Sequence, residues 1–147
     1  MASENATVLT FGYPATLVAE YPAWFVLLRP QQVTAGALVL AHRGDATAFS
    51  ALPAAAYAGL QQAIGDIERN LKSLVRYERI NYLMLMMVDP HVHFHVLPRY
   101  SGSRTLGGLD VMDHGWPRAP DLTKFAQPEP SVLADIARTL RASWKRV

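Results

Sequence analysis

The chain contains no cysteine, and this absence removes three classes of site at once. A disulfide framework, a thiolate metal site and a cysteine nucleophile all depend on that side chain. Any chemistry in this protein must therefore rest on other residue types, and the five histidines are the first to examine.

Long apolar runs and runs of positive charge are also missing. The longest apolar stretches, 23–28 and 82–88, fall far short of the ~20 residues of a membrane-spanning helix. The first ten residues contain Glu4 and no apolar run, so we expect no secretory signal and a cytoplasmic location. Because Lys and Arg are scattered and the net charge is only +2, we expect no nucleic-acid or membrane partner.

The composition predicts one folded domain. Half of the 147 residues are hydrophobic and 18% are charged, which suits a chain that closes a single core. We expect this domain to span 1–147, with a flexible N-terminus over 1–12. The segment 101–130 is rich in glycine and proline and is predicted to be a long, partly ordered surface excursion.

Several short apolar segments bounded by turn residues predict strands. They cover 16–20, 23–28, 36–41, 79–88 and 91–100, with a further short strand near 106–111. Asp89-Pro90 is expected to be the turn that joins the strands 79–88 and 91–100. In that register Met84 and Met86 would lie opposite His95 and His93.

Two segments have the periodicity of helices. From Pro53 onward an apolar residue recurs every three or four positions, which predicts one long helix that ends near Arg76 with a core-facing stripe: Tyr57, Leu60, Ile64, Ile67, Leu71 and Leu74. A C-terminal helix is expected from about Ser131. Together the elements predict an α+β fold, an antiparallel sheet of about five strands with one long central helix and a C-terminal helix.

Three histidines alternate within five residues, at His91, His93 and His95. Alternate side chains of a strand share a face, so the imidazoles project together. The residues between and after them are apolar and should pack beneath the long helix: Val92, Phe94 and Val96. The imidazoles are then expected to line an open surface or cleft. If Phe94 is fully buried, its replacement by alanine should cost ~3–5 kcal/mol of stability.

Three interpretations of the histidines compete. The first is a solvated sheet face. The second is a metal site, but the outer two residues lie ~13 Å apart at the backbone, so an ion would need a further ligand such as His42, His114 or Asp89. The third is nucleophilic attack on phosphorus by the central His93, because an imidazole with an ordinary pKa of about 6.5 is largely neutral near pH 7. We favour the third.

The segment His91-Val92-His93-Phe94-His95-Val96-Leu97, followed by Pro98-Arg99, resembles the signature of the histidine triad (HIT) superfamily, in which histidines alternate with hydrophobic residues. Segments 29–40 and 113–117 are similar to that family as well. The likeness is strongest to bacterial HIT-like hydrolases that are described as diadenosine-polyphosphate hydrolases.

This resemblance implies a half-open antiparallel sheet, a homodimer and a two-step reaction on a nucleotide substrate. His93 would attack the α-phosphorus to form a covalent nucleotidyl-histidine, and water or another acceptor would release the nucleoside monophosphate. His91 and His95 would hold phosphate oxygens. The scheme requires no metal and no cofactor.

The chain departs from the family pattern in two places. A Gly-Gln-Ser/Thr segment that contacts phosphate is replaced by residues 86–90, and Arg99, Arg29 and Asn81 are candidates for the missing contacts. Arg29 also occupies a position where relatives place an acidic or amide residue that reaches the ribose. The expected activity is a HIT-type nucleotidyl hydrolase or transferase. The alternatives are a non-catalytic nucleotide-binding protein and a histidine-ligated metal-dependent enzyme.

Overall fold

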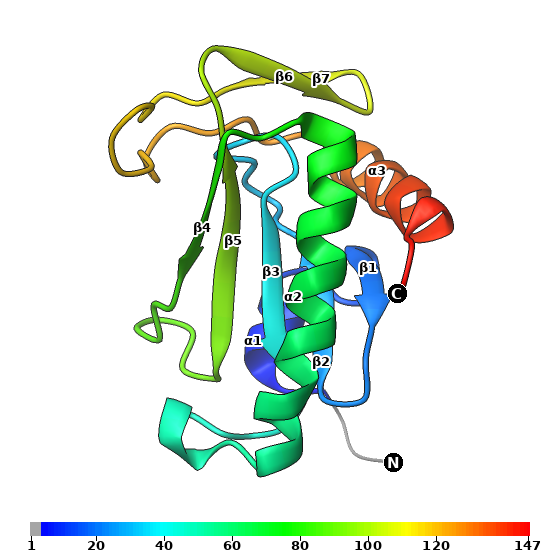
Figure 1. Cartoon of the computed structure of the whole chain (residues 1–147), viewed down its shortest axis with the longest axis vertical. Helices are drawn as coiled ribbons and strands as arrows, with labels where there is room; N and C mark the ends of the chain where they lie inside the picture. Colours follow the sequence, from blue (N-terminus) through cyan, green and yellow to red (C-terminus); the bar gives the residue numbers. More distant parts are fainter. Residues whose placement is uncertain (1–3) are drawn as a thin grey trace.

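The computed structural model describes residues 4–147 and contains one five-stranded antiparallel sheet with helices (Figure 1). The strand order is β1-β2-β3-β5-β4, so β1 and β4 are the edges. The predicted α+β fold with a five-stranded antiparallel sheet is confirmed. The strands of this sheet are β1 (Leu17–Glu20), β2 (Trp24–Leu28), β3 (Leu38–His42), β4 (Arg79–Leu83) and β5 (His93–Arg99).

The long helix α2 (Ala54–Val75) covers one face of the sheet (Figure 1). Pro53 is its N-cap, and it ends at Arg76, whose φ of 48° is left-handed. The predicted helix is confirmed, but the ends of its predicted stripe are wrong, because Tyr57 and Leu74 are 41% and 38% exposed. The fully buried positions include two alanines, which bring the helix close to the sheet: Ala56, Ala63, Ile67, Leu71 and Val75.

Close approach of α2 to the sheet is visible at Trp24. The Trp24 indole N–H donates to the carbonyl oxygen of Ala56 at 2.8 Å, and the side chain has no exposed surface. A larger residue at Ala56 would push the helix away and break this contact. The small side chain of Ala56 therefore allows the helix to lie this close to the sheet.

The connection between β4 and β5 differs from the prediction. β4 ends at Leu83, and residues 84–92 form a loop instead of a longer strand and a two-residue turn. Met87 and Val88 are 82% and 93% exposed, so nothing packs on them to hold them in the sheet. The register pairs Leu83 with His95, and the expected pairing of Met84 and Met86 with the histidines is wrong.

The N-terminal segment packs on the face of the sheet opposite α2. Helix α1 (Ala6–Thr10) contributes Val8 to a second apolar cluster, which also contains Phe25, Leu27, Val39 and Ala41. We predicted a flexible N-terminus over 1–12; residues 6–10 instead form this helix, and residues 1–3 lie outside the described part of the chain.

Asn5 explains why α1 is held in place. Its side-chain oxygen accepts a hydrogen bond from the Val8 N–H at 2.9 Å, as an N-cap does. Its amide nitrogen donates to the carbonyl oxygens of His42 and Gly44 at 3.0 and 2.9 Å. One buried side chain therefore starts the helix and attaches it to the end of β3.

Segment 101–130 contains more regular structure than we predicted. In place of one strand near 106–111 there is a hairpin of β6 (Ser103–Leu106) and β7 (Leu109–Met112). Gly107 and Gly108 form its turn with φ values of 57° and 80°, a conformation that suits glycine. A 3-10 turn, η1 (Phe49–Ala51), precedes α2, and α3 (Pro130–Ser143) ends the fold as expected. No helix in residues 4–147 is long and apolar enough to span a membrane.

Phe94 gives a first stability test. Its ring is partly buried and packs near Trp24 and Phe49, with ring centroids 6.0 and 5.9 Å away. Because part of the ring remains exposed, we expect Phe94→Ala to lower the free energy of unfolding by about 2 kcal/mol, less than a fully buried phenylalanine would. Urea denaturation measures the change. A loss below about 0.5 kcal/mol would contradict this packing.

Candidate functional site

Strand β5 places His93 and His95 on the face that α1 covers. The register pairs His93 with Ala41 and His95 with Val39, both members of the cluster beneath α1. Val92 and Val96 belong to the main core under α2, and Phe94 packs against it. The predicted division of the segment between two faces is therefore confirmed.

The expected exposure of the imidazoles is wrong. His93 has no exposed surface, and His95 is 7% exposed. The ring of Phe11 lies over both, with centroid distances of 5.5 Å to His93 and 5.6 Å to His95. The cause is the ordered N-terminal segment, which covers the face that the sequence pattern leaves open.

His93 has one ring nitrogen fixed and one without a partner. Its Nδ1 lies 2.7 Å from the carbonyl oxygen of His91, and a carbonyl can only accept, so Nδ1 carries the proton. In the neutral ring Nε2 then holds a free lone pair. Within residues 4–147 this buried Nε2 makes no hydrogen bond. A neutral, correctly oriented and unpaired imidazole nitrogen is the form that attacks an electrophile.

His91 is held by the N-terminal segment. The hydroxyl of Thr7 accepts a hydrogen bond from the His91 backbone N–H at 3.3 Å and lies 2.9 Å from its Nδ1. His91 is half-buried, in the loop just before β5. Thr7 thus orients the first histidine of the triad from a position 84 residues away in the chain.

His95 is paired with a cation. The Nε–H of Arg29, at the end of β2, donates to Nδ1 of His95 at 3.1 Å, which leaves the His95 proton on Nε2. Burial, followed by the charges of Arg29 and His93, lowers the pKa of His95 to about 4. His95 is therefore a neutral ring that can donate a hydrogen bond from Nε2 at physiological pH.

The lowered pKa of His95 predicts how stability changes with pH. An unfolded histidine binds a proton near its ordinary pKa of about 6.5, whereas the folded one does so only near 4. Between these values the unfolded state holds more protons, so stability is complete above pH ~6.5 and falls as the pH drops toward ~4. The contribution of His95 to this loss should be roughly 2–3 kcal/mol.

Urea denaturation at about pH 7.5 and about pH 4.5 tests this expectation. The wild-type protein should lose more unfolding free energy than His95→Gln between the two conditions. Equal losses in the two proteins would show that His95 is not held neutral by its surroundings.

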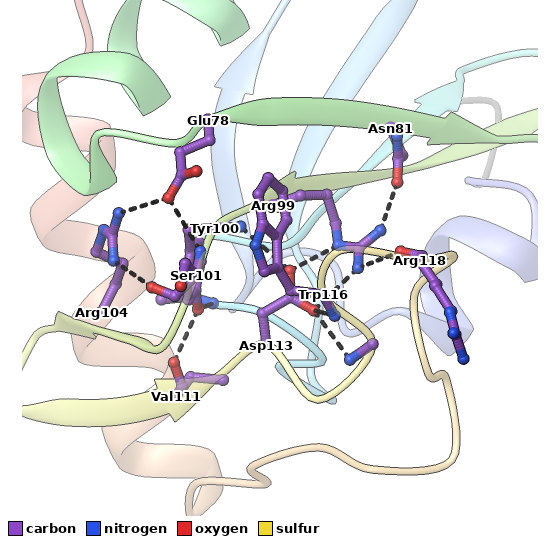
Figure 2. Close-up of polar contacts among 12 residues, drawn as sticks. Glu78, Asn81, Arg99, Tyr100, Ser101, Arg104, Val111, Asp113, Trp116 and Arg118 are labelled. Carbon is purple, nitrogen blue, oxygen red and sulfur yellow. Dashed lines mark hydrogen bonds and ion pairs between the residues drawn. The ribbon is translucent and has the colours of Figure 1, made fainter.

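Arg99 and Asn81 lie on the same face of the sheet but belong to a different network (Figure 2). Arg99 is 3% exposed and donates Nε to Asp113 at 2.7 Å, with a second hydrogen bond to the same carboxylate at 3.0 Å. It also donates to the Asn81 side-chain oxygen and to the Arg118 carbonyl oxygen, each at 2.8 Å. These contacts fasten the loop after β7 to the sheet.

Asp113 is the centre of this network and was not identified from the sequence. Besides Arg99, its carboxylate accepts the backbone N–H groups of Tyr100, Gly115 and Trp116 at 3.1–3.2 Å (Figure 2). A buried carboxylate needs its charge compensated, and Arg99 and these hydrogen bonds provide that compensation.

A cavity of about 230 Å³ lies next to residues that surround the buried histidines. Phe11 and Arg29, which contact the triad, are part of its wall. The remaining lining residues come from the end of α1, from the segment after β2 and from the segment before α3: Thr10, Pro30, Gln31 and Gln127. Sequence reasoning missed Thr7, Thr10 and Phe11, because nothing in residues 1–12 indicates which face of the sheet they cover.

The residues named for the metal interpretation do not gather. Within residues 4–147 no group of three or more His, Asp or Glu side chains is arranged to hold a metal ion.

Several solved structures share the fold of this chain. The histidine triad protein blr8122 from Bradyrhizobium japonicum has a TM-score of 0.72 at 20% identity, covering 97% of this chain and 98% of that one. A histidine triad protein from Sinorhizobium meliloti has a TM-score of 0.71 at 17% identity, with 95% of each chain covered.

A third similar structure is a hypothetical histidine triad nucleotide-binding protein from Sulfolobus tokodaii. Its TM-score is 0.66 at 15% identity, and the match covers 93% of this chain and 88% of that one. No family model and no curated protein sequence matches the chain. The comparisons therefore establish that this chain has the fold of histidine triad proteins.

Proposed function

We propose that this protein is a nucleotidyl hydrolase or transferase of the histidine triad type, with His93 as the nucleophile. The observation that carries the proposal is the orientation of His93, whose Nδ1 faces the His91 carbonyl at 2.7 Å and whose Nε2 is free. A protein could share this fold without having the His93 ring in that orientation. That orientation is the arrangement that a covalent attack on phosphorus needs.

In the first step Nε2 of His93 forms a bond to the α-phosphorus of a nucleoside monophosphate derivative. The bond from phosphorus to the leaving group breaks, and the leaving group departs with that electron pair and takes up a proton. In the second step water attacks the phosphorus, the P–N bond returns its electrons to Nε2, and the water gives up a proton. The products are the nucleoside monophosphate and free imidazole.

The neighbouring side chains stabilise the charge that develops on the phosphate oxygens. We assign this role to His95 through its Nε2–H and to His91, and Arg29 acts here by orienting the His95 ring. Arg29 fixes the orientation of the His95 ring, and Thr7 fixes that of His91 while the N-terminal segment is in place.

For Asn81 and Arg99 we propose a supporting role instead of a phosphate contact. Four of the N–H donors of Arg99 already bind Asp113, Asn81 and the Arg118 carbonyl. The pair therefore acts by holding β4, β5 and the loop after β7 together beside the triad.

The substrate class that we propose is a phosphoanhydride or phosphoramidate of a nucleoside monophosphate, dinucleoside polyphosphates included. Access must involve the N-terminal segment, because Phe11 covers the His93 ring. We further propose a homodimer in the cytoplasm. The unpaired edge of β4, whose residues are mostly half-buried, offers a surface for the second copy.

A non-catalytic nucleotide-binding protein is the second candidate. The burial of Nε2 of His93 favours it, since a nitrogen without access to solvent cannot react until the site opens. Both candidates predict that the protein binds nucleotide, but only the hydrolase or transferase predicts turnover.

The proposal is tested by incubating the protein with dinucleoside polyphosphates and nucleoside phosphoramidates and measuring release of AMP and GMP, with chelator present. Release by wild type and none by His93→Ala supports the hydrolase. Tight nucleotide binding without any release, unchanged in His93→Ala, supports the binding protein.

A further inference from the structure

Arg29 is a buried cation without an acidic partner. The residue is 9% exposed, and within residues 4–147 no Asp or Glu forms an ion pair with it. Burial lowers the pKa of Arg29, yet a guanidinium stays protonated at neutral pH. Burying a charge without a counter-charge is costly, so this position favours an anion supplied from outside the chain.

The hydrogen bonds of Arg29 leave most of its donors free. Nε donates to His95 and one terminal nitrogen donates to the Gln31 carbonyl oxygen at 2.7 Å. A guanidinium has five N–H groups, so about three remain on its terminal nitrogens. Paired N–H groups of this kind match the two oxygens of a carboxylate or phosphate.

The free donors belong to a residue that lines the 230 Å³ cavity. The polar groups in its wall besides Arg29 are uncharged, the Thr10 hydroxyl and the amides of Gln31 and Gln127. Phe11 lies between this cavity and the triad, since its ring also packs against His93 and His95. Arg29 both lines the cavity and contacts His95, so it places a positive charge next to the triad.

We propose that this cavity, the Arg29 cavity, binds a second anionic group of the substrate, separate from the phosphate that His93 attacks. The inference rests on the proposed function and specifies its substrate class: a nucleotide with a second phosphate or carboxylate. An uncharged sugar hydroxyl in this cavity would leave the Arg29 guanidinium without a counter-charge. The second anion has two possible sources, the nucleoside itself or the group that leaves.

Binding measurements separate these sources. Isothermal titration of wild-type protein with AMP, ADP and adenosine 3′,5′-bisphosphate, and with the guanosine equivalents, compares one anionic group with two. At least one two-anion ligand should bind about 10-fold or more tightly than the monophosphate. ADP places its second anion on the leaving side, whereas the bisphosphate places it on the ribose. Equal affinities, or no binding at millimolar concentration, overturn the proposal.

Substitutions at Thr10 test the cavity without removing Arg29. Thr10 is exposed at the end of α1, so both Thr10→Glu and Thr10→Gln should fold. The carboxylate of Thr10→Glu can occupy the cavity and pair with Arg29, which should remove the preference for the second anion. The uncharged Thr10→Gln, of the same size, should keep most of it. Equal preferences in the two variants contradict the proposal.

A substitution of Arg29 is compared with a substitution of an exposed arginine, Arg138. Arg29→Gln should bring the affinities for one and two anionic groups together, whereas Arg138→Gln, at an exposed position on α3, should leave their ratio as in wild type. Thermal unfolding shows whether Arg29→Gln is folded, because this residue also holds His95.

Failure of this proposal and failure of the proposed function are distinguishable. Binding does not require turnover, so a preference for two anions without any release of nucleotide would contradict only the enzyme. Release through His93 with no such preference would contradict only the Arg29 cavity.

Discussion

Replacing His93 with alanine is expected to lower the rate of nucleoside monophosphate release by roughly 10⁴-fold or more. The reason is that Nε2 of His93 forms the bond to phosphorus, and within residues 4–147 it is the one buried imidazole nitrogen without a hydrogen-bond partner. Steady-state release from the preferred nucleotide measures the loss.

The variant should remain folded. Because the His93 ring is buried, its removal leaves a small cavity, and we expect a loss of about 1–2 kcal/mol in unfolding free energy. His114→Ala is the control, since that histidine is exposed, and its rate should match wild type. A folded His93→Ala protein that retains a tenth of the activity would exclude His93 as the nucleophile.

Replacing Asp113 with alanine is expected to give the largest loss of stability, about 3–5 kcal/mol. The change removes five hydrogen bonds to one carboxylate and leaves the Arg99 guanidinium buried without a counter-charge. Chemical denaturation followed by fluorescence of the three tryptophans measures it.

An exposed ion pair supplies the control for Asp113. Asp135 also pairs with an arginine, Arg138, but both side chains are about two-thirds exposed, so Asp135→Ala should cost under ~1 kcal/mol. Replacing both Arg99 and Asp113 with apolar residues should recover only the part of the loss that the unpaired guanidinium causes, because the N–H groups of Tyr100, Gly115 and Trp116 still lack their acceptor. A loss in Asp113→Ala as small as in Asp135→Ala would contradict this account of the network.

The sequence predicted the parts of the site that lie within one element. Alternation over residues 92–96 was enough to place His93 and His95 on one face and Val92 and Val96 on the other, because a strand has a period of two. The long helix was equally visible in its spacing. Both patterns are local, so neither depends on how distant segments pack.

The N-terminal segment covers the histidines through contacts between residues far apart in the sequence, and a local sequence pattern does not predict such contacts. Thr7 and Phe11 reach the triad from the N-terminal segment, where five helical residues give too short a pattern to indicate a packed element. The loop between β4 and β5 has apolar residues that suit a strand, but Met87 and Val88 are 82% and 93% exposed and do not pack on the sheet, so the prediction of a strand there is wrong. Gly107-Gly108, in contrast, is a local hairpin signal that the sequence contains.

The central claim is that His93 forms a covalent bond to phosphorus, and trapping this bond tests it most directly. The protein is mixed with its preferred nucleotide, quenched within one turnover, digested and examined by mass spectrometry. The account predicts a nucleotidyl adduct on the peptide that contains His93, absent from His93→Ala. Rapid release of nucleoside monophosphate with no adduct at any quench time, or with an adduct on another residue, would contradict it.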